Sequence, residues 1–504
     1  MKAENDEFSF QKRLVDTFEM EVDLEKALDL AGAGKYHIFH GMLMVASLSS
    51  ALLEMIGSSF VLPAAACDLD IPEHLRGILT SIPNIGVILS APFWGRAADT
   101  VGRKPILLAC SAAAGCFGLL AAFTPNLLTF ALCKLAGSFF LSCPSSLGFA
   151  YVGEMTPRKR RDFAVVTCNG ILTLSAALSP IIAWAVLSYD WQLGHITLQP
   201  WRVLTAVYAL PLLVTTVWMT QANESPKFLM AKGKQDQALK VLREIYAVNT
   251  GMAKESFCVT SLSKSLEDSE ETGEAINYNR GHKKYSLLVL LRPPHLKWLA
   301  LTGFLMFGLF SLLNGLFLFA PATINKIMSQ STEQGGNLCT LMNQAENKTS
   351  SAECVADISF STFQIMVVSG VVYGSLVLAA GFTSLAKKTQ LVSMFVLVGI
   401  ACLITVLTEN RMVAGAAMST LQVTALGIGP LTAYAVQLFP TSLRGTAVGA
   451  VLMFGRIGSV VGSNVAGVFL AKACAATVYG FSALVFLCAG LSFLLPREQT
   501  ANVR

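Results

Sequence analysis

Twelve long apolar runs constrain what this chain can fold into. Each approaches the roughly 20 residues that an α-helix needs to cross the hydrocarbon core of a bilayer. Six runs lie in each half of the chain, at 41–65, 77–95, 105–124, 128–152, 164–187, 201–221, 297–322, 359–382, 390–408, 412–436, 446–470 and 475–495. An alternative with eleven spans leaves out 128–152 or 359–382. The pattern predicts an all-α membrane protein.

The composition agrees with this prediction. Charged residues make up 14% of the chain and hydrophobic residues 53%, whereas soluble domains carry about 25% charged residues. The net charge of +5 is spread along the chain, so the sequence gives no support for nucleic-acid binding. Neither a Walker A motif nor a Gly-x-Ser-x-Gly elbow is present. We therefore expect no enzymatic activity, no cofactor and no metal site.

Lys and Arg in the short loops predict which side faces the cytoplasm. The richer set of loops holds Arg96, Arg103, Lys104, Arg158, Lys159, Arg160, Arg161, Lys387, Lys388 and Arg444. This side is predicted to carry both ends, 1–40 and 497–504, and a linker at 223–295 between six-helix bundles at 41–222 and 296–496. "GKQDQALKVLREIYAVN" in the linker predicts an amphipathic helix. A second short helix before the first span is expected to end at Gly32 and Gly34.

The two halves repeat one another. Tyr151, Glu154, Pro157 and Arg161 follow the fourth span, and Tyr434, Gln437, Pro440 and Arg444 follow the tenth, each 283 positions later. Shifted by 284, Arg103 and Lys104 fall on Lys387 and Lys388, while Asp99 falls on Thr383. The second copy thus keeps positive charge and loses its acids. Parallel repeats of six spans are typical of one large transporter class.

Several motifs support the same class. "GRAADTVGRK", Gly95 to Lys104, matches every position of Gly-x-x-x-Asp-x-x-Gly-Arg-Lys. "NESPKFL" at 223–229, "QLFPTSLRGTAVG" at 437–449 and "LPREQT" at 495–500 look like worn signatures of sugar and organic-ion porters. The chain resembles the major facilitator superfamily. That resemblance implies twelve helices in two pseudo-symmetric six-helix bundles.

A narrower resemblance rests on "LLEMIGSSFVLPAAACDLDI", "ANESPKFLMAKGKQDQALKVLREIY" and the loop between spans seven and eight. These stretches resemble synaptic vesicle glycoprotein 2 and its relatives, which are related to organic cation and carnitine carriers. Two functions follow. The first is a secondary active or facilitative transporter of a small organic solute (an organic cation, a zwitterion or a sugar-like molecule). The alternative is a transporter-shaped glycoprotein of the plasma or a vesicle membrane that acts as a regulator or binding partner.

The first motif predicts a cytoplasmic gate. Asp99 is expected to hold the N-terminus of span eleven near Gly445, and Arg103 to pair with Glu154, joined by Arg161. This cluster would lock the halves together and break when the protein faces inward. The alternative is a loop that only sets topology, which accounts for Arg96 and Lys104. The full predicted gate is Gly95, Asp99, Gly102, Arg103, Lys104, Glu154, Arg161, Gln437 and Arg444.

Glu54 lies mid-way along span one and is expected to face the central cavity, where it would bind a cation or carry a proton. The alternative is a structural carboxylate paired with a nearby donor. Lys134 is expected to pair with an acid or to reach the outer face, and is a further candidate for the pathway. Polar residues that line the path or join helices are Asn84, Asn169, Asn314, Gln422 and Asn464. Arg456 is expected to anchor the cytoplasmic end of span eleven.

The loop between spans seven and eight is predicted to lie on the oxidising side. A Cys339–Cys354 disulfide is therefore expected there, with Cys67 as a competing partner. Asn347 starts a sequon, which is either glycosylated or unused. The partners we expect are the lipid bilayer and a small-molecule substrate, with proton or cation coupling, for a monomer.

Overall fold

The computed structural model describes residues 20–189, 191–193, 196–263, 290–293, 295–329, 337–340, 342, 358–381, 386–439 and 441–496. Over this part of the chain, twelve helices are long and apolar enough to cross a membrane. The twelve-span prediction is therefore confirmed and the eleven-span alternative is wrong. Both runs that the alternative left out, at 128–152 and 359–382, form helices of sufficient length.

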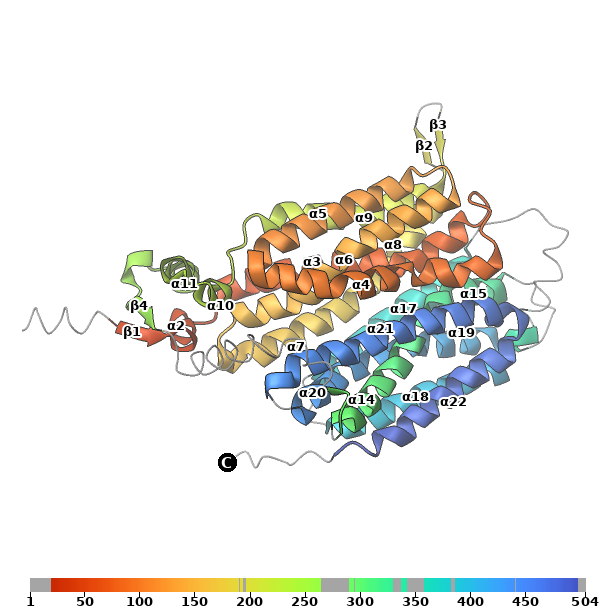
Figure 1. Ribbon diagram of the computed structural model, residues 1–504. Coiled ribbons are helices and arrows are strands. Elements are labelled where there is room, and N and C mark those ends of the chain that lie inside the picture. The colour runs from red at the N-terminus through yellow and green to blue at the C-terminus, as the bar shows by residue number, and fades with distance from the viewer. Residues whose placement is uncertain are drawn as a thin grey trace, which may run out of the picture.

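The first six spans are, in order, α3 (Lys35–Ala65), α4 (Glu73–Val101), α5 (Arg103–Ala122), α6 (Leu127–Met155), α7 (Arg158–Ser175) with α8 (Leu178–Leu187), and α9 (Pro200–Met219). The second six are α14 (His295–Phe310) with η2 (Ser311–Gly315), η3 (Leu316–Phe319) and α15 (Ala320–Met328); α17 (Phe360–Gly381); α18 (Lys387–Leu407); α19 (Arg411–Ser419) with η4 (Thr420–Gly427) and α20 (Ile428–Leu438); α21 (Thr441–Lys472); and α22 (Cys474–Ser492). The six helices of each half gather into one bundle (Figure 1).

Three spans are interrupted near the middle. Pro180 lacks an N–H for the Ala176 carbonyl, and span five breaks there between α7 and α8. Span seven passes through the π turn η2, where the backbone of Gly315 comes so close to Gly462 that a Cβ would stand 2.9 Å from its Cα. Span ten passes through η4, just before Pro430. Discontinuous helices of this kind form binding sites in many transporters.

The two ends of the molecule differ (Figure 1). One end carries the short antiparallel hairpin β2 (Trp191–Leu193) and β3 (Ile196–Leu198), and we call it the hairpin end. The other carries α2 (Leu24–Ala31), α10 (Pro226–Ala231), α11 (Gln235–Thr250) and η1 (Lys254–Ser256), and we call it the linker end. Both helices predicted outside the spans are therefore confirmed, and α2 ends at Gly32 as expected.

The linker end also contains a contact that the sequence did not predict. Strands β1 (Met20–Asp23) and β4 (Val259–Ser263) pair in parallel, so the N-terminal segment and the linker form one small unit. Asn249 at the end of α11 joins this unit to span one. Its Nδ2 donates to the carbonyls of Ala31 and Gly32, at 3.2 and 2.8 Å, and its Oδ1 accepts from the Tyr36 N–H at 3.0 Å.

The buried apolar residues form two main cores. One core runs through the second half of the chain and includes hairpin-end residues of the first half, among them Phe60, Leu79 and Trp201. The other belongs wholly to the first half at the linker end, where it packs α2, α10 and α11 against the bundle. The halves therefore share a core at the hairpin end, while the linker-end core stays within one half.

Equivalent contacts in the two halves confirm the internal repeat. Lys104 Nζ donates to the Thr220 carbonyl at the end of α9, and Lys388 Nζ donates to the Phe493 carbonyl after α22, at 2.8 and 2.7 Å. The hydroxyl of Tyr151 donates to the carbonyl of Asn223, which follows span six. In the same way, the hydroxyl of Tyr434 donates to the carbonyl of Pro496, which follows span twelve. Lys104 therefore caps a helix as well as contributing positive charge.

Candidate functional site

A small cavity lies between the two halves, at the level of the helix interruptions. Its volume is about 20 Å³, which is room for about one water molecule. Ala176 and Pro180 come from the break in span five, Phe317 from η3 and Gln422 from η4, and the other lining residues are Ile56, Phe60, Met366 and Gly370. Both bundles contribute to one enclosed space, and most of its wall is apolar.

The halves are in tight contact on the hairpin side of this cavity. The rings of Phe60 in α3 and Phe363 in α17 stack with centroids 6.1 Å apart. Between α4 and α21, a Cβ on Gly467 would stand 2.5 Å from the Cα of Gly77. Small residues allow such backbone approach. Any larger side chain here would push the two helices apart.

The same two helices separate toward the linker end. Among the described residues, no atom outside its own helix lies within 4 Å of a Cβ placed on Gly95 of α4, or on Gly445 or Gly449 of α21. All three glycines are exposed. Farther from the linker end, the same two helices are joined by the hydrogen bond from Arg456 Nη1 to Asn84 Oδ1, at 3.2 Å. The helices α4 and α21 are thus in contact at the hairpin end and apart at the linker end.

Glu54 does not face the cavity as predicted. Its Oε1 accepts from Lys134 Nζ at 2.5 Å, and each side chain is 9% exposed. The pair lies inside the first bundle, where Glu54 is close to Gly118 of α5. This corrects the cavity-facing placement and agrees with the alternative of a paired carboxylate; Lys134 does not reach the outer face. The second carboxylate oxygen, Oε2, is buried without a hydrogen-bond partner.

The neutral polar candidates divide into three groups. Gln422 is buried and lines the central cavity. Asn84 and Asn464 join the halves: Asn84 accepts from Arg456, and Asn464 Nδ2 lies 3.4 Å from Ser81 Oγ. Asn314 lies in the π turn and Asn169 is exposed on α7. Their roles in a solute pathway stay predictions.

Arg456 lies in a different place from the one predicted. It sits mid-way along α21, not at its end, because α21 begins at Thr441. Its guanidinium carbon lies 5.6 Å from the centroid of the Phe310 ring. The predicted span 446–470 already places ten residues, nearly three helical turns, before Arg456, so its depth follows from the sequence itself. Arg456 thus joins the halves instead of anchoring one end.

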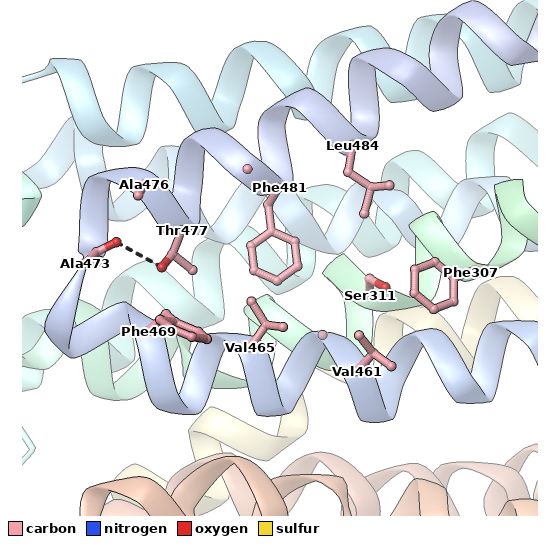
Figure 2. A pocket seen from close by; sticks show the side chains of 12 residues that line it. Phe307, Ser311, Val461, Val465, Phe469, Ala473, Ala476, Thr477, Phe481 and Leu484 are labelled. Atoms are coloured by element: carbon pink, nitrogen blue, oxygen red, sulfur yellow. Dashed lines mark hydrogen bonds between the residues drawn. The ribbon is translucent and has the colours of Figure 1, made fainter.

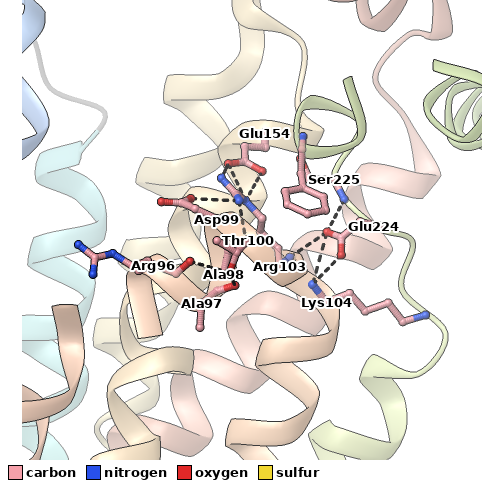
Figure 3. Close-up of polar contacts among 11 residues, drawn as sticks. Arg96, Ala97, Ala98, Asp99, Thr100, Arg103, Lys104, Glu154, Glu224 and Ser225 are labelled. Carbon is pink, nitrogen blue, oxygen red and sulfur yellow. Dashed lines mark hydrogen bonds and ion pairs between the residues drawn. The ribbon is translucent and has the colours of Figure 1, made fainter. Parts of the chain in front are cut away.

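The predicted gate cluster is present in part (Figure 3). Arg103 Nη2 lies 3.0 Å from Glu154 Oε1, and its Nη1 lies 3.1 Å from Asp99 Oδ1. All three residues belong to the first half, so these pairs form within one bundle, which corrects the expectation that they join the two halves. Asp99 contacts Arg103 and not the start of α21, and 71% of its side chain is exposed.

Glu224 is a functional candidate that sequence reasoning missed. Its carboxylate accepts from the backbone N–H groups of Arg103, Lys104 and Ser225 at 2.8–3.4 Å, so it caps the start of α5 (Figure 3). An acid is favourable at a helix N-terminus. Gly102 makes room for it: its φ is +130°, and a Cβ there would stand 2.4 Å from the Glu224 carboxylate. The "NESPKFL" motif was the available signal.

Arg161 has another partner than the one predicted. Its Nη2 lies 2.9 Å from Glu25 Oε1 in α2, and the same oxygen lies 2.5 Å from Lys227 Nζ in α10. Burial raises the pKa of Glu25, but hydrogen bonds and charge from Lys227 and Arg161 outweigh burial and hold the pKa below its ordinary value of 4.5. Arg161 therefore fastens the N-terminal helix and does not join Arg103 and Glu154.

The second copy of the gate is described only in part. Gln437 is exposed, and its side chain forms no hydrogen bond with the described residues. The side chain of Arg444 lies outside the described residues, so its predicted part in the gate stays a prediction. At the hairpin end, Cys339 is bonded to Cys474 at the start of α22, which corrects the expected Cys339–Cys354 pairing. Cys67 is also disulfide-bonded. Cys354 and the sequon at Asn347 lie outside the described residues.

A larger pocket of about 340 Å³ lies within the second half, between η2, α21 and α22 (Figure 2). Its wall is mostly apolar, with Phe481 and Val465 facing one another across it. Val461, Val465 and Phe469 are each at least 38% exposed, so the pocket is on the outer surface of the bundle. A bilayer would fill it with acyl chains. It is therefore not the site of a polar solute.

Comparison with known proteins identifies the family. The sequence model of the Major Facilitator Superfamily matches residues 42–462. The chain belongs to the Major Facilitator Superfamily. It is an integral, multi-pass membrane protein with the twelve-helix fold of this superfamily.

Relatives agree with the narrower resemblance. Over 242 residues the chain is 31% identical to synaptic vesicle glycoprotein 2C of Rattus norvegicus, covering 47% of this chain and 33% of that protein. It is 27% identical to synaptic vesicle glycoprotein 2B of Homo sapiens over 259 residues, covering 50% and 38%. The chain thus matches only about a third of the length of these relatives.

Solved structures show the same fold. The xylose transporter XylE from E. coli, in a partially occluded inward-open conformation, has a TM-score of 0.66 at 15% identity, covering 92% of this chain and all of XylE. XylE bound to 6-bromo-6-deoxy-D-glucose, a proton:xylose symporter, has a TM-score of 0.64 at 16% identity, covering 92% and 96%. At this identity the likeness concerns the fold alone.

Proposed function

We propose that this superfamily member transports a small organic solute by alternating access. The observation that carries the proposal is the cavity between the halves, which is bounded by interruptions in spans five, seven and ten. Where a helix changes to a π or 3₁₀ turn, as in spans seven and ten, the regular hydrogen-bond pattern shifts and leaves backbone groups for a ligand. Gln422 adds a side-chain amide to this site.

The two ends of the structure fit one stage of such a cycle. The Phe60–Phe363 stack and the Gly77–Gly467 approach close the route on the hairpin side. On the linker side α4 and α21 have parted, so a solute would reach the level of Arg456 from there. In the opposite stage, Asp99 would meet the N-terminus of α21 and stabilise closure of the linker end.

We assign the linker end to the cytoplasm. Its loops carry the excess of Lys and Arg. The hairpin end carries the Cys339–Cys474 disulfide, which fits an oxidising compartment. The distribution of positive charge and the position of the disulfide support the same sidedness.

We further propose that the solute is coupled to a proton through Glu54. One oxygen is paired with Lys134, and the other is buried without a partner. Protonation would release Lys134 inside the bundle, and a buried cation without its partner is costly. Because α3 carries both Glu54 and the cavity residues Ile56 and Phe60, a shift of α3 that accompanies protonation would reach the cavity.

The test combines a conformational and a transport measurement on the full-length protein. Spin labels at Arg96→Cys and Gly449→Cys, in a Cys116→Ser background, report the separation of α4 and α21 in lipid nanodiscs. We expect two distance populations whose ratio changes with a transported solute. Labels at Arg96→Cys and Arg158→Cys, both in the first half, serve as the control and should keep one distance.

Uptake is measured in proteoliposomes with a panel of labelled neutral and charged solutes, xylose included, with and without an imposed proton gradient. Glu54→Gln should abolish the response to the gradient. A single inter-helix distance under all conditions, together with no uptake across the panel, would overturn the proposal.

A second candidate function is favoured by the relatives, which are named as synaptic vesicle glycoproteins. In this reading the chain is a membrane glycoprotein that binds a partner without transport. It predicts no uptake in the same experiment, and it predicts a fixed separation of α4 and α21.

A further inference from the structure

We propose that the transported solute carries a carboxylate, as an organic anion or a zwitterion, and that Arg456 binds it. This inference rests on the proposed function, because it names the solute class of that pathway. Three charged side chains lie well inside the described spans: Glu54, Lys134 and Arg456. The first two neutralise one another at 2.5 Å. Arg456 is left as the one unmatched charge of the three.

The surroundings of Arg456 are polar or aromatic but not acidic. One guanidinium N–H donates to Asn84 Oδ1, and the Phe310 ring lies under the guanidinium. Among the described residues, no carboxylate lies within 4.0 Å of it. A charge at this depth is costly and marks a functional position in membrane proteins. A ligand of opposite charge removes that cost.

The remaining N–H groups of Arg456 are free to bind. Guanidinium carries five N–H donors, and the described residues supply an acceptor for one of them. Arg456 is half-buried, and none of its nitrogen atoms is among the described side-chain atoms that are buried without a partner. A planar guanidinium binds a carboxylate through two parallel hydrogen bonds. The geometry therefore suits a carboxylate better than an ammonium group.

A solute that enters between α4 and α21 from the linker end would reach Arg456. On α21 the exposed glycines Gly445 and Gly449 precede it along one face, and on α4 exposed Gly95 lies on the face that leads to Asn84. The Arg456–Asn84 contact is where the two helices come together again. It lies in the same interface that must change when the halves rock. A bound carboxylate would compete with Asn84 and so loosen this contact.

This assignment differs from a cation site at Glu54. Glu54 already has an ammonium partner in Lys134 and lies inside the first bundle. A cationic solute entering from the linker end would meet the positive charge of Arg456 instead. The balance of charge along the route thus favours an anionic group on the solute.

The experiment measures ligand-induced stabilisation of the purified full-length protein in nanodiscs. The probes are monocarboxylates of increasing carbon skeleton, each paired with its primary amide, together with sodium chloride and sodium phosphate. A ligand that binds the folded state raises the unfolding temperature. We expect at least one carboxylate to raise it by a few degrees while its amide does not. Arg456→Gln should lose the shift and Arg456→Lys should retain part of it.

Lys472→Gln is the matched control, because it removes the same charge from the exposed end of the same helix and should keep the shift. If Arg456→Gln fails to yield folded protein, the ratio of carboxylate to amide stabilisation in Arg456→Lys decides. Equal stabilisation by carboxylate and amide, a shift that survives Arg456→Gln, or stabilisation by chloride or phosphate alone would overturn the proposal.

Uptake in proteoliposomes separates this inference from the proposed function. Carboxylate binding without uptake would support the anion site and contradict the proposed transport. Uptake of a neutral solute that is unaffected by Arg456→Gln would support the proposed transport and contradict the anion site.

Discussion

Lys134 Nζ lies 2.5 Å from Glu54 Oε1, and the two side chains join spans four and one inside the first bundle. Removing one member leaves a buried charge unpaired, which costs about 3–5 kcal/mol in comparable cases. We expect Lys134→Met to lower the unfolding temperature in nanodiscs strongly. The double variant Glu54→Leu with Lys134→Met should recover most of that loss while abolishing proton-dependent uptake. Equal stability of both variants would contradict the pairing.

Gly102 and Gly95 come from the same motif but have different surroundings. A Cβ on Gly102 meets the Glu224 carboxylate, and its φ of +130° is strained for other residues, whereas Gly95 faces open space. Gly102→Ala should lower the unfolding temperature, because it displaces the α5 cap, a contact worth about 0.5–2 kcal/mol. Gly95→Ala should leave that temperature unchanged or slightly higher. Similar losses in both variants would contradict the cap.

Asp99 is expected to act on the conformational equilibrium and not on folding. Its side chain is 71% exposed, and its partner Arg103 also binds Glu154. Asp99→Asn should therefore retain membrane expression while shifting the spin-label distances toward the open linker end and slowing uptake. Exposed Lys159→Gln is the control. An unchanged distance distribution with unchanged uptake kinetics would remove Asp99 from the gate.

The attachment of α2 should depend on pH through Glu25. Its pKa is below 4.5 in the folded protein, because Lys227 and Arg161 outweigh the effect of burial. The stabilisation is therefore fully present above about pH 4.5 and is lost as the pH falls through the lower folded-state pKa. Hydrogen exchange of Leu24–Ala31 should increase over that range. Glu25→Gln should show the faster exchange already at pH 7, and no difference from the wild type at pH 7 would contradict the docking contact.

The Cys339–Cys474 bond closes a stretch of 135 residues within the second half. Loss of a native disulfide costs about 2–5 kcal/mol in small secreted domains. Cys339→Ser and Cys474→Ser should lower the unfolding temperature equally, and the double variant should match each single one. Peptide mapping without reduction should recover a linked Cys339–Cys474 peptide. A Cys339–Cys354 peptide in its place would contradict the structure.

Much of the fold followed from local patterns. Apolar run length determined the twelve spans, because a bilayer demands a helix of about 20 residues whatever its neighbours. The spacing of the repeat anticipated that Lys104 and Lys388 have equivalent roles, and charge chemistry anticipated the Arg103–Glu154 pair. The spans and the lysine contacts depend on local sequence or on a duplicated pattern, whereas the Arg103–Glu154 pair joins residues 51 positions apart and followed from their opposite charges.

Partners across long sequence distances were decided only by the tertiary structure. Cys474 binds Cys339, Glu25 binds Arg161 and Glu224 binds the Arg103 N–H, each across more than 100 residues, and several chemically suitable partners compete in the sequence. The sequence by itself determined that Glu54, Lys134 and Arg456 are charges inside a membrane. Packing decided that Glu54 and Lys134 neutralise one another while Arg456 meets the uncharged Asn84, because electrostatic pairing acts over a few ångströms and depends on which helix faces meet.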